Sequence, residues 1–188
     1  MTKTEREKML ANEPYHAFDS ELNQMTAKAQ ELLQAFNTTQ HHEAKNRRII
    51  LHSLLGAMGT NVEIKPPFFC DYGCHIFMGD NVFMNYDCVI LDCNYVHIGN
   101  NVLIAPKVQI YTAYHPIDPA IRLTGVEMAA PIAIGNNVWL GGGAIVCPGV
   151  TIGDNVTIGA GSVVTKNIPA NVVAVGNPCR VINQVEPP

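Results

Sequence analysis

His115 is the residue of this sequence best suited to proton transfer near neutral pH. It lies in the segment YTAYHPIDPAIRLTGVEMAAP, which also contains Glu127. An imidazole titrates near neutral pH, so His115 can accept a proton from a hydroxyl group as a general base. Glu127 is the candidate to orient that imidazole, because a carboxylate beside a histidine commonly does so. On the residues alone, plainer explanations also hold: a turn histidine bonded to backbone, and an exposed loop glutamate.

The remaining histidines and the cysteines do not predict a metal or redox centre. The other six histidines fall in the N-terminal region or at expected strand corners: His16, His41, His42, His52, His75 and His97. The six cysteines include no CxxC pair of the kind that binds zinc or exchanges disulfides. The opening MTKTEREKML lacks an apolar signal core, so we expect the cysteines to stay reduced in the cytoplasm. We expect no metal at the site.

The element that must position His115 is a six-residue repeat of aliphatic side chains. In the C-terminal half the repeat is unbroken over six positions: Ile134, Leu140, Val146, Ile152, Ile158 and Val164. The same spacing occurs earlier in three triplets: Met58, Ile64 and Cys70; Met78, Met84 and Ile90; Ile98, Ile104 and Ile110. A period of six fits neither an α-helix nor a strand of alternating polarity.

Three hexapeptides close one turn of a triangular prism, in which each side is a short parallel strand and each corner is a turn with Gly, Asn or Asp. Fifteen ladder positions at three per turn predict about five coils. An α/β fold would need helices between the strands, and a β-sandwich would show alternating patterning. Neither fits the strict period. The sequence therefore predicts an all-β main domain, a parallel β-helix over residues 58–188 with an excursion at 111–131.

Residues 1–57 predict a different structure. One apolar stripe at helical spacing runs from Leu22 to Phe36, and a second runs from Ile50 to Leu55 and ends at Gly56. We expect these two helices to form an N-terminal cap on the first coil, whose strand edges would otherwise be free to pair with other chains.

The composition excludes several classes of protein. Twelve Lys and Arg against sixteen Asp and Glu give a net charge of −4, without the basic cluster that nucleic acid or an anionic membrane requires. A hydrophobic fraction of 47% with 15% charged residues is too apolar for a disordered chain. No run of the sequence reaches the roughly 20 apolar residues that span a bilayer. We expect a folded protein without nucleic-acid or membrane partners.

Together these features resemble the bacterial maltose and galactoside O-acetyltransferases of the left-handed β-helix superfamily. The resemblance covers nearly the whole chain and rests on the ladder, LANEPY, YTAYHPID, IGNNVWLGGGAIVCPGVTIGDNVTIGAGSVVTKNIP and VGNPCRVI. The ladder alone identifies the fold, whereas the His115 segment and the C-terminal run are specific for the sugar-type enzymes. The resemblance implies a left-handed β-helix, acetyl-CoA as co-substrate, a sugar hydroxyl as acceptor, and a homotrimer with sites between subunits.

The resemblance also implies roles on the acceptor side. His115 matches the essential histidine of the family, and Asn85 matches a position that touches the acceptor and stabilises the transition state. Asp71 matches an acceptor-binding position, where a carboxylate can accept hydrogen bonds from sugar hydroxyls. Asp19 corresponds loosely to an acceptor-side aspartate that galactoside enzymes carry two places earlier, where this chain has Ala17.

Two further expectations concern the same residues. Asp92 does not match the family pattern directly, because Cys93 holds the neighbouring family position, and such departures favour the maltose-type branch. Asn85 and Asp71 share the second position of a hexapeptide, so we expect both to line one wall of the prism. A corner asparagine and a solvated turn aspartate are the plainer explanations.

On the donor side, cations are scarce after residue 111, yet two of them follow the last coils. Lys166 with Thr165, and Arg180, match family positions that hold the pantetheine and nucleotide ends of coenzyme A. Gly142 and Ala160 match positions where main-chain groups meet the pantetheine arm, and the Gly142 N–H is also a candidate oxyanion donor. The coil corners need small residues in any case.

The expected reaction is a direct transfer in a ternary complex, because no cysteine lies beside His115 to form an acyl-enzyme. A prism has three flat sides, so three chains can pack with the His115 excursion of one against the wall of the next. Three alternatives stay open: a same-fold acetyltransferase for a non-sugar hydroxyl such as an antibiotic or serine, a γ-class carbonic anhydrase with three histidines on zinc, and a non-catalytic β-helix scaffold. The sequence does not identify the acceptor.

Overall fold

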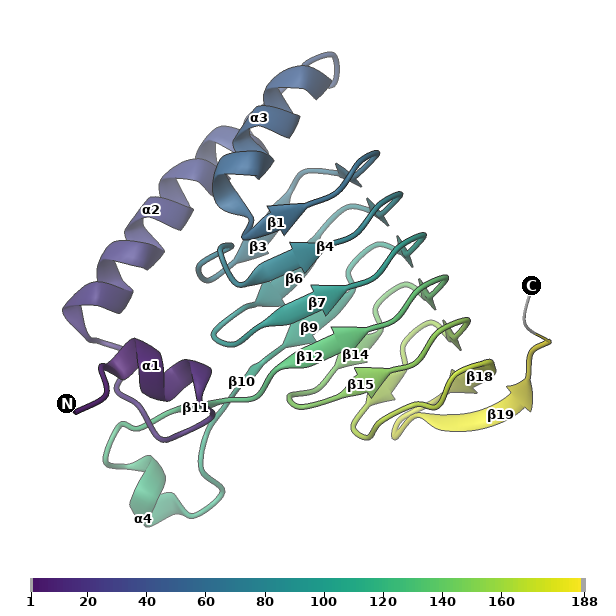
Figure 1. Cartoon of the computed structure of the whole chain (residues 1–188). Coiled ribbons are helices and arrows are strands. Elements are labelled where there is room, and N and C mark those ends of the chain that lie inside the picture. The colour runs from purple at the N-terminus through teal and green to yellow at the C-terminus, as the bar shows by residue number, and fades with distance from the viewer. Residues whose placement is uncertain (1, 187–188) are drawn as a thin grey trace.

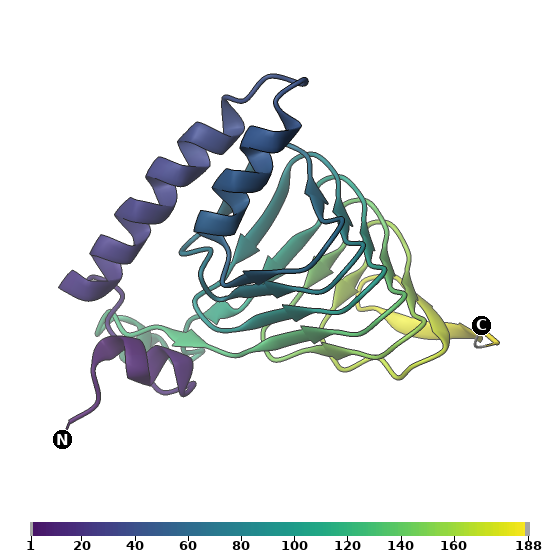
Figure 2. The same cartoon turned by 45° about the horizontal axis from the view of Figure 1, so that its top comes forward.

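The computed structural model describes residues 2–186, which form a triangular prism of short strands with helices at its N-terminal end (Figure 1). Figure 2 shows the coils stacked over one another as triangles, with two helices beside the first of them. This architecture confirms the predicted parallel β-helix and its helical cap.

Each side of the prism is one sheet, to which successive coils each contribute a strand. The first sheet contains β1 (Ala57–Met58), β4 (Ile76–Met78), β7 (Val96–Ile98), β12 (Ile132–Ile134) and β15 (Thr151–Ile152). The second contains β2 (Glu63–Ile64), β5 (Phe83–Met84), β8 (Leu103–Ile104), β13 (Trp139–Leu140), β16 (Thr157–Ile158) and β18 (Val172–Val175), with β19 (Arg180–Gln184) antiparallel at its end. The third contains β3 (Phe68–Cys70), β6 (Cys88–Leu91), β9 (Gln109–Tyr111), β14 (Ile145–Val146) and β17 (Val163–Val164).

The aliphatic ladder fills the interior of the prism. All of its fifteen residues except Met58 are buried. At roughly 1.5–3 kcal/mol for each fully buried aliphatic side chain, this ladder is the main stabilising element of the coils. Five coils are complete, and a partial sixth begins at Ile168 and continues through β18, out of phase with the ladder. Ile168 bridges to Ile152, and Ala174 pairs with Ile158.

The corner between the first and second sheets is held by a column of asparagines with φ between 54° and 61°: Asn61, Asn81, Asn101, Asn137, Asn155 and Asn171. Asparagine tolerates this left-handed conformation better than most residues. Each side-chain amide donates a hydrogen bond to the next asparagine of the column, at 2.7–3.1 Å. The column therefore fixes the register of the coils, and with it the positions of the other two corners.

Helices α2 (Ser20–Asn37) and α3 (Ala44–Leu54) cover the first coil. Their apolar stripes, including Phe36 and Leu51, belong to the same buried cluster as the interior of the prism. A further helix, α1 (Glu5–Leu10), was not expected from the sequence; Thr4 and Glu7 form a capping box at its start. Among residues 2–186, no helix combines the length and the apolar character needed to cross a bilayer.

The excursion leaves the prism after β9 and returns before β12. Its root is an antiparallel ribbon of β10 (Ala113–Tyr114) and β11 (Met128–Ala129), and its outer part carries the short helix α4 (Pro119–Arg122). Figure 1 shows this ribbon beside α1, with α4 projecting away from the coils.

Candidate active site

His115 directly follows β10 and is exposed. In the ribbon, Tyr114 pairs with Met128 in antiparallel register. The next pair along this register is His115 with Glu127, and directly opposed residues of an antiparallel pair point to the same face. The fold therefore places the two residues at neighbouring positions of the ribbon, but no hydrogen bond or ion pair joins their side chains in the described residues, and the roles assigned to them stay predictions.

Glu127 is held in place by Tyr15, which lies in the segment between α1 and α2 (residues 11–19), here called the N-terminal arm. The Tyr15 N–H donates to the Glu127 carbonyl at 3.1 Å, and the Glu127 N–H donates back at 2.9 Å. The Tyr15 hydroxyl also donates to Glu127 Oε2 at 3.2 Å. The sequence reasoning included this tyrosine in LANEPY without giving it a role, because nothing in the local pattern shows a pairing across 112 positions.

Asp71 lies half-buried beside Cys93, whose thiol donates to Asp71 Oδ2 at 3.3 Å. Burial raises the pKa of the Asp71 carboxyl to about 6. The turn that carries Asp71 is shaped by the fully buried Asp92, which accepts the N–H groups of Asp71 and Tyr72 at 3.0 and 2.9 Å. Asp71 is thus a weakly acidic carboxyl at a fixed corner, suited to accept hydrogen bonds from a hydroxyl ligand.

The Tyr15 hydroxyl also lies next to the Cys93 thiol, so the acceptor-side residues form one cluster. Burial, followed by the neighbouring Cys93, raises the pKa of Tyr15. Burial and the nearby Asp71 likewise raise the pKa of Cys93. Both groups therefore stay protonated and act as hydrogen-bond donors near neutral pH.

Asp19 has a local task in the structure. It is the N-cap of α2, and its Oδ1 accepts the Glu21 N–H at 2.9 Å. No hydrogen bond within residues 2–186 joins it to Asp71 or His115. Its expected part in acceptor binding stays a prediction.

The third sheet separates the predicted site residues into two groups. Asn85 precedes β6 at the corner where Gly142 and Ala160 precede β14 and β17, one position earlier than these two: the register aligns Tyr86 with Gly142 and Ala160. These residues form a column at the N-terminal margin of the sheet. Val175 stacks on Gly159 in the next coil, and Arg180 pairs with Val175. Arg180 therefore lies at the same corner, one coil further along.

The C-terminal margin of the same sheet carries the other group. Asp71 follows β3, Cys93 follows β6, and the His115 excursion follows β9. Thr165 and Lys166 follow β17 at this margin, and both are exposed. Because all strands of the sheet are parallel, these residues stack along one edge of the prism.

Asn85 and Asp71 do flank one wall of the prism, the third sheet, but they do not lie side by side on it. The shared hexapeptide position recurs at every corner of the prism, so it does not say which corner a residue occupies. Asn85 follows a strand of the second sheet and Asp71 follows a strand of the third. The two residues are at opposite margins of the third sheet.

The column at the N-terminal margin offers free main-chain donors. At this corner the N–H of Tyr86 is taken by Asn85 Oδ1 at 2.9 Å, and the next equivalent position is Pro106, which has no N–H. Gly142 and Ala160 follow in the two coils below, and neither N–H has a hydrogen-bond partner in the described part of the chain. The Asn85 Nδ2 group likewise has no partner there.

The small size of Gly142 is not required by the coil. Its φ is not in the left-handed region, and an added Cβ would meet Pro106 O at 3.5 Å, an ordinary contact. At Gly141 the same atom would lie 2.5 Å from the Ala160 nitrogen. Gly141 therefore serves the fold, whereas Gly142 leaves space on the outside of the corner.

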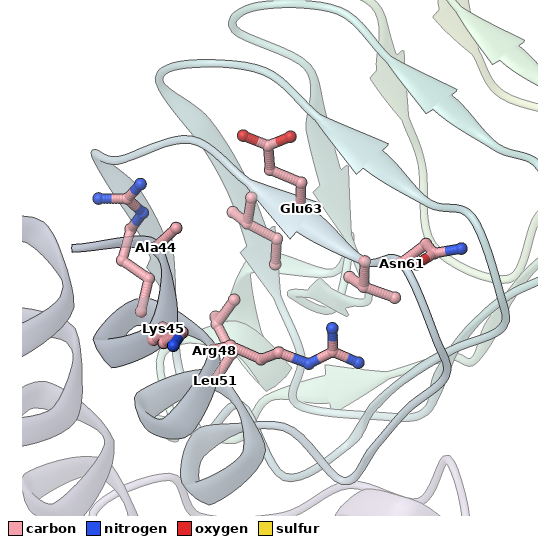
Figure 3. A pocket seen from close by; sticks show the side chains of 9 residues that line it. Ala44, Lys45, Arg48, Leu51, Asn61 and Glu63 are labelled. Atoms are coloured by element: carbon pink, nitrogen blue, oxygen red, sulfur yellow. The ribbon is translucent and has the colours of Figure 1, made fainter. Parts of the chain in front are cut away.

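A cavity of about 490 Å³ lies elsewhere, between α3 and the first coil (Figure 3). It is lined by cationic residues such as Lys45 and Arg48 on one side and by Asn61 and Glu63 on the other. None of the residues predicted to act in catalysis borders it. Among residues 2–186, no group of three His, Cys, Asp or Glu side chains is placed to hold a metal ion.

Two family models match the chain. The maltose acetyltransferase hexapeptide capping motif matches residues 8–59, and the bacterial transferase hexapeptide, with six repeats, matches residues 131–166. Nodulation protein L of Rhizobium meliloti is 49% identical over 181 residues, which cover 96% of this chain and 99% of that protein.

Two solved structures resemble the whole chain. A maltose O-acetyltransferase from Clostridium difficile matches with a TM-score of 0.98 and 51% identity over 100% of both chains. A galactoside acetyltransferase in complex with coenzyme A matches with a TM-score of 0.95 and 38% identity, over 98% of this chain and 92% of that one. With the capping motif, the repeat and the ribbon of His115 in place, this chain belongs to the maltose and galactoside O-acetyltransferase family of left-handed β-helix enzymes and is itself an O-acetyltransferase.

Proposed function

We propose that this enzyme transfers the acetyl group of acetyl-CoA to a hydroxyl of a maltose- or glucose-like sugar, with His115 as general base. The site is built between two chains of a homotrimer. The observation that carries the proposal is the division of the predicted residues between the two margins of the third sheet. One margin offers main-chain donors and an amide, and the other offers the base and an acceptor carboxyl.

The donor side fits the chemistry of acetyl-CoA, and the related galactoside acetyltransferase holds coenzyme A. The free N–H groups of Gly142 and Ala160 can bind amide carbonyls of the pantetheine arm. Lys166 and Arg180 are exposed cations that can bind its phosphates, with Thr165 beside Lys166 as a hydroxyl donor.

The acceptor side fits a sugar. Asp71 can accept hydrogen bonds from two hydroxyls, and its half-buried corner favours a polar ligand of small size. The relatives named for maltose and galactosides support this acceptor class. Asp19 belongs to the same proposal, as an acceptor contact that becomes available where a neighbouring chain completes the site.

The reaction proceeds by addition of the hydroxyl to the thioester, followed by elimination of the thiolate. As His115 takes the proton of the acceptor hydroxyl, the hydroxyl oxygen attacks the thioester carbon, and the carbonyl becomes an oxyanion. The Asn85 Nδ2 group and the Gly142 N–H donate hydrogen bonds to that oxyanion. The carbon–sulfur bond then breaks, the sugar keeps the acetyl group, and the imidazolium returns its proton to the leaving thiolate. No metal takes part in this scheme.

Assembly from two chains follows from distances. The four residues of β6 alone separate the margins of the third sheet by about 10 Å at 3.3 Å per residue. A base and an oxyanion donor must both lie within about 3 Å of the reacting atoms. Packing three prisms side by side brings one margin of each chain against the other margin of the next. We place the enzyme in the cytoplasm, which is supported by six unpaired cysteines.

An acceptor screen tests the proposal. Purified enzyme with acetyl-CoA is incubated with maltose, glucose, a galactoside, chloramphenicol or serine, and the acetylated product is measured by mass spectrometry. We expect turnover on the glucose-type sugars. His115→Ala should lower kcat by about 10²-fold or more, whereas His42→Ala, an exposed histidine before α3, should not change it. Full turnover by His115→Ala, or turnover confined to chloramphenicol or serine, would contradict the proposal.

A further inference from the structure

Tyr15 lies outside the residues that carry the proposed reaction, yet it touches the root of the His115 excursion at three points. Its main chain exchanges two hydrogen bonds with Glu127, and its hydroxyl donates to Glu127 Oε2 at 3.2 Å. The side chain has an exposed fraction of 0%. The main-chain pair is sufficient to attach the arm to the ribbon, so the hydroxyl bond adds something different: it fixes the direction of the Glu127 carboxylate.

The surroundings make this arrangement rigid. Tyr15 packs in a buried cluster with Met9, Tyr72 and Cys93. The fully buried Asn94 ties the same region together, since its Nδ2 donates to the Met9 carbonyl at 3.0 Å and to the Ala129 carbonyl at 2.7 Å. The arm therefore pairs with the ribbon of β10 and β11 at one isolated antiparallel bridge, and the Asn94 hydrogen bonds attach α1, which precedes the arm, and β11 to the prism.

The ribbon carries this order to His115. Glu127 lies opposite His115 when the register that pairs Tyr114 with Met128 is continued by one position, although no hydrogen bond or ion pair joins the two side chains in the described residues. A carboxylate held next to an imidazole selects one orientation of the ring and stabilises its protonated form. A carboxylate that is free to turn towards solvent does not select one ring orientation and does not consistently stabilise the protonated ring.

We propose that Tyr15 is a positioning residue for acetyl transfer, whose hydroxyl holds the Glu127 carboxylate on the face of the ribbon that carries His115. The proposal rests on the proposed function, because it assigns His115 as the base. It adds that the N-terminal arm takes part in catalysis through Glu127, and that removal of one hydroxyl on the arm changes the proton affinity of a residue 100 positions away.

The first test is Tyr15→Phe, which keeps the ring and both main-chain bonds. We expect kcat to fall about 10-fold, as for other partners that orient a reactive group, with the acetyl-CoA KM unchanged. The acidic limb of the kcat profile, measured at saturating sugar so that the acceptor KM does not contribute, should move to lower pH, because His115 loses a stabilising neighbour. Glu127→Gln should give the same shift. The double variant should be no worse than Glu127→Gln alone, since Tyr15 acts only through that carboxylate.

Tyr114→Phe is the matched control. The Tyr114 hydroxyl also joins the ribbon to the arm, by a hydrogen bond to Asn12 Oδ1 at 2.9 Å, but it does not contact Glu127. We expect wild-type kcat and an unshifted pH profile for this variant. Equal effects from Tyr114→Phe and Tyr15→Phe would mean that any tether of the arm suffices, and would overturn the proposal.

The remaining outcomes separate the two levels of inference. If His115→Ala keeps full turnover, the proposed function fails. If His115→Ala is inactive but Tyr15→Phe leaves the pH profile in place, or its loss adds to that of Glu127→Gln, only the role of Tyr15 is refuted. If Tyr15→Phe does not fold, Glu127→Gln decides alone: an unshifted acidic limb would exclude the carboxylate as the element through which Tyr15 acts.

Discussion

Asn85 and Asp71 occupy the same position of the hexapeptide but lie at opposite margins of one sheet. Strand β6 lies between the two margins. A single reacting hydroxyl therefore cannot touch both residues within one chain. If both serve acetyl transfer, each site takes Asn85 from one chain and Asp71 with His115 from its neighbour.

Mixing two inactive variants tests this division quantitatively. His115→Ala and Asn85→Ala are each expected to be inactive, and random assortment of equal amounts makes three quarters of the trimers mixed. Each mixed trimer has one interface with both native residues out of three, so about one quarter of wild-type activity should return. Activity is measured after the chains are unfolded and refolded together.

The control pairs two residues of the same margin. In a mixture of His115→Ala with Asp71→Ala, His115 remains only on chains that lack Asp71, so every active interface should keep the raised acceptor KM of Asp71→Ala if both residues come from one chain. Interfaces with the wild-type acceptor KM in this control, or no recovery in the first mixture with mixed trimers confirmed, would refute the shared-site arrangement.

Acceptor affinity should depend on the protonation of Asp71. Burial raises the pKa of this carboxyl to about 6, so it is neutral below that pH and loses part of its capacity as an acceptor. The acceptor KM of the wild type should therefore rise as the pH falls through about 6. Asp71→Asn should raise that KM at pH 7.5 by about 10-fold and remove the pH dependence, with the acetyl-CoA KM unchanged. A persistent pH dependence in the variant would assign it to another group.

The same raised pKa predicts an effect on stability. The folded chain holds the Asp71 proton more tightly than the unfolded chain, so this group costs stability as the pH rises from its ordinary pKa to about 6. Asp71→Asn removes that cost, and its Tm relative to the wild type should be higher at pH 7.5 than at pH 4. Thermal unfolding at both pH values measures the difference; a change of the opposite sign would mean that Asp71 is ionised at little cost.

The sequence was sufficient to predict the coils because their interior is strictly periodic. Each ladder residue is an independent observation of the same spacing, and the helices of the cap have ordinary apolar stripes. The site was harder. The site residues were found by resemblance to the family. Their spacing predicted that Asn85 and Asp71 lie together, because a six-residue period is the same at all three corners and does not identify the corner.

The role of Tyr15 could not be predicted because it depends on a contact between distant parts of the chain. Its contact with Glu127 joins the first and the middle parts of the chain, and no local pattern records such a pairing. The sequence also did not predict the partial sixth coil, because Ile168 enters the interior four residues after Val164 and so is out of phase with the ladder.

Lys166 and Arg180 should contribute to donor binding through charge. Neutralising either residue is expected to raise the acetyl-CoA KM by about 10-fold with the acceptor KM unchanged, because each would lose a hydrogen bond to a charged group. The defect should shrink for an acetyl-pantetheine donor that lacks the nucleotide. Arg122→Gln, on the short helix α4, is the control and should bind both donors as the wild type does. Equal losses with both donors would show a structural role instead.

Gly142 and Gly141 are adjacent glycines for which the structure predicts opposite outcomes. A Cβ at Gly141 would lie 2.5 Å from the Ala160 nitrogen, so Gly141→Ala must displace the next coil and lower the Tm. At Gly142 the nearest atom is Pro106 O at 3.5 Å and φ is not left-handed, so Gly142→Ala should leave the Tm within about 1–2 °C of the wild type.

The cost of Gly142→Ala should fall on the donor instead. The added methyl group would occupy the outside of the corner, where the free N–H groups of Gly142 and Ala160 are expected to meet the pantetheine arm. We therefore expect a higher acetyl-CoA KM, with an unchanged acceptor KM and the same increase for acetyl-pantetheine, because the arm is common to both donors. Steady-state kinetics with the two donors provide the measurement. A variant with wild-type donor kinetics would place the pantetheine arm away from this corner, and a lowered Tm would show that Gly142 serves the coil after all.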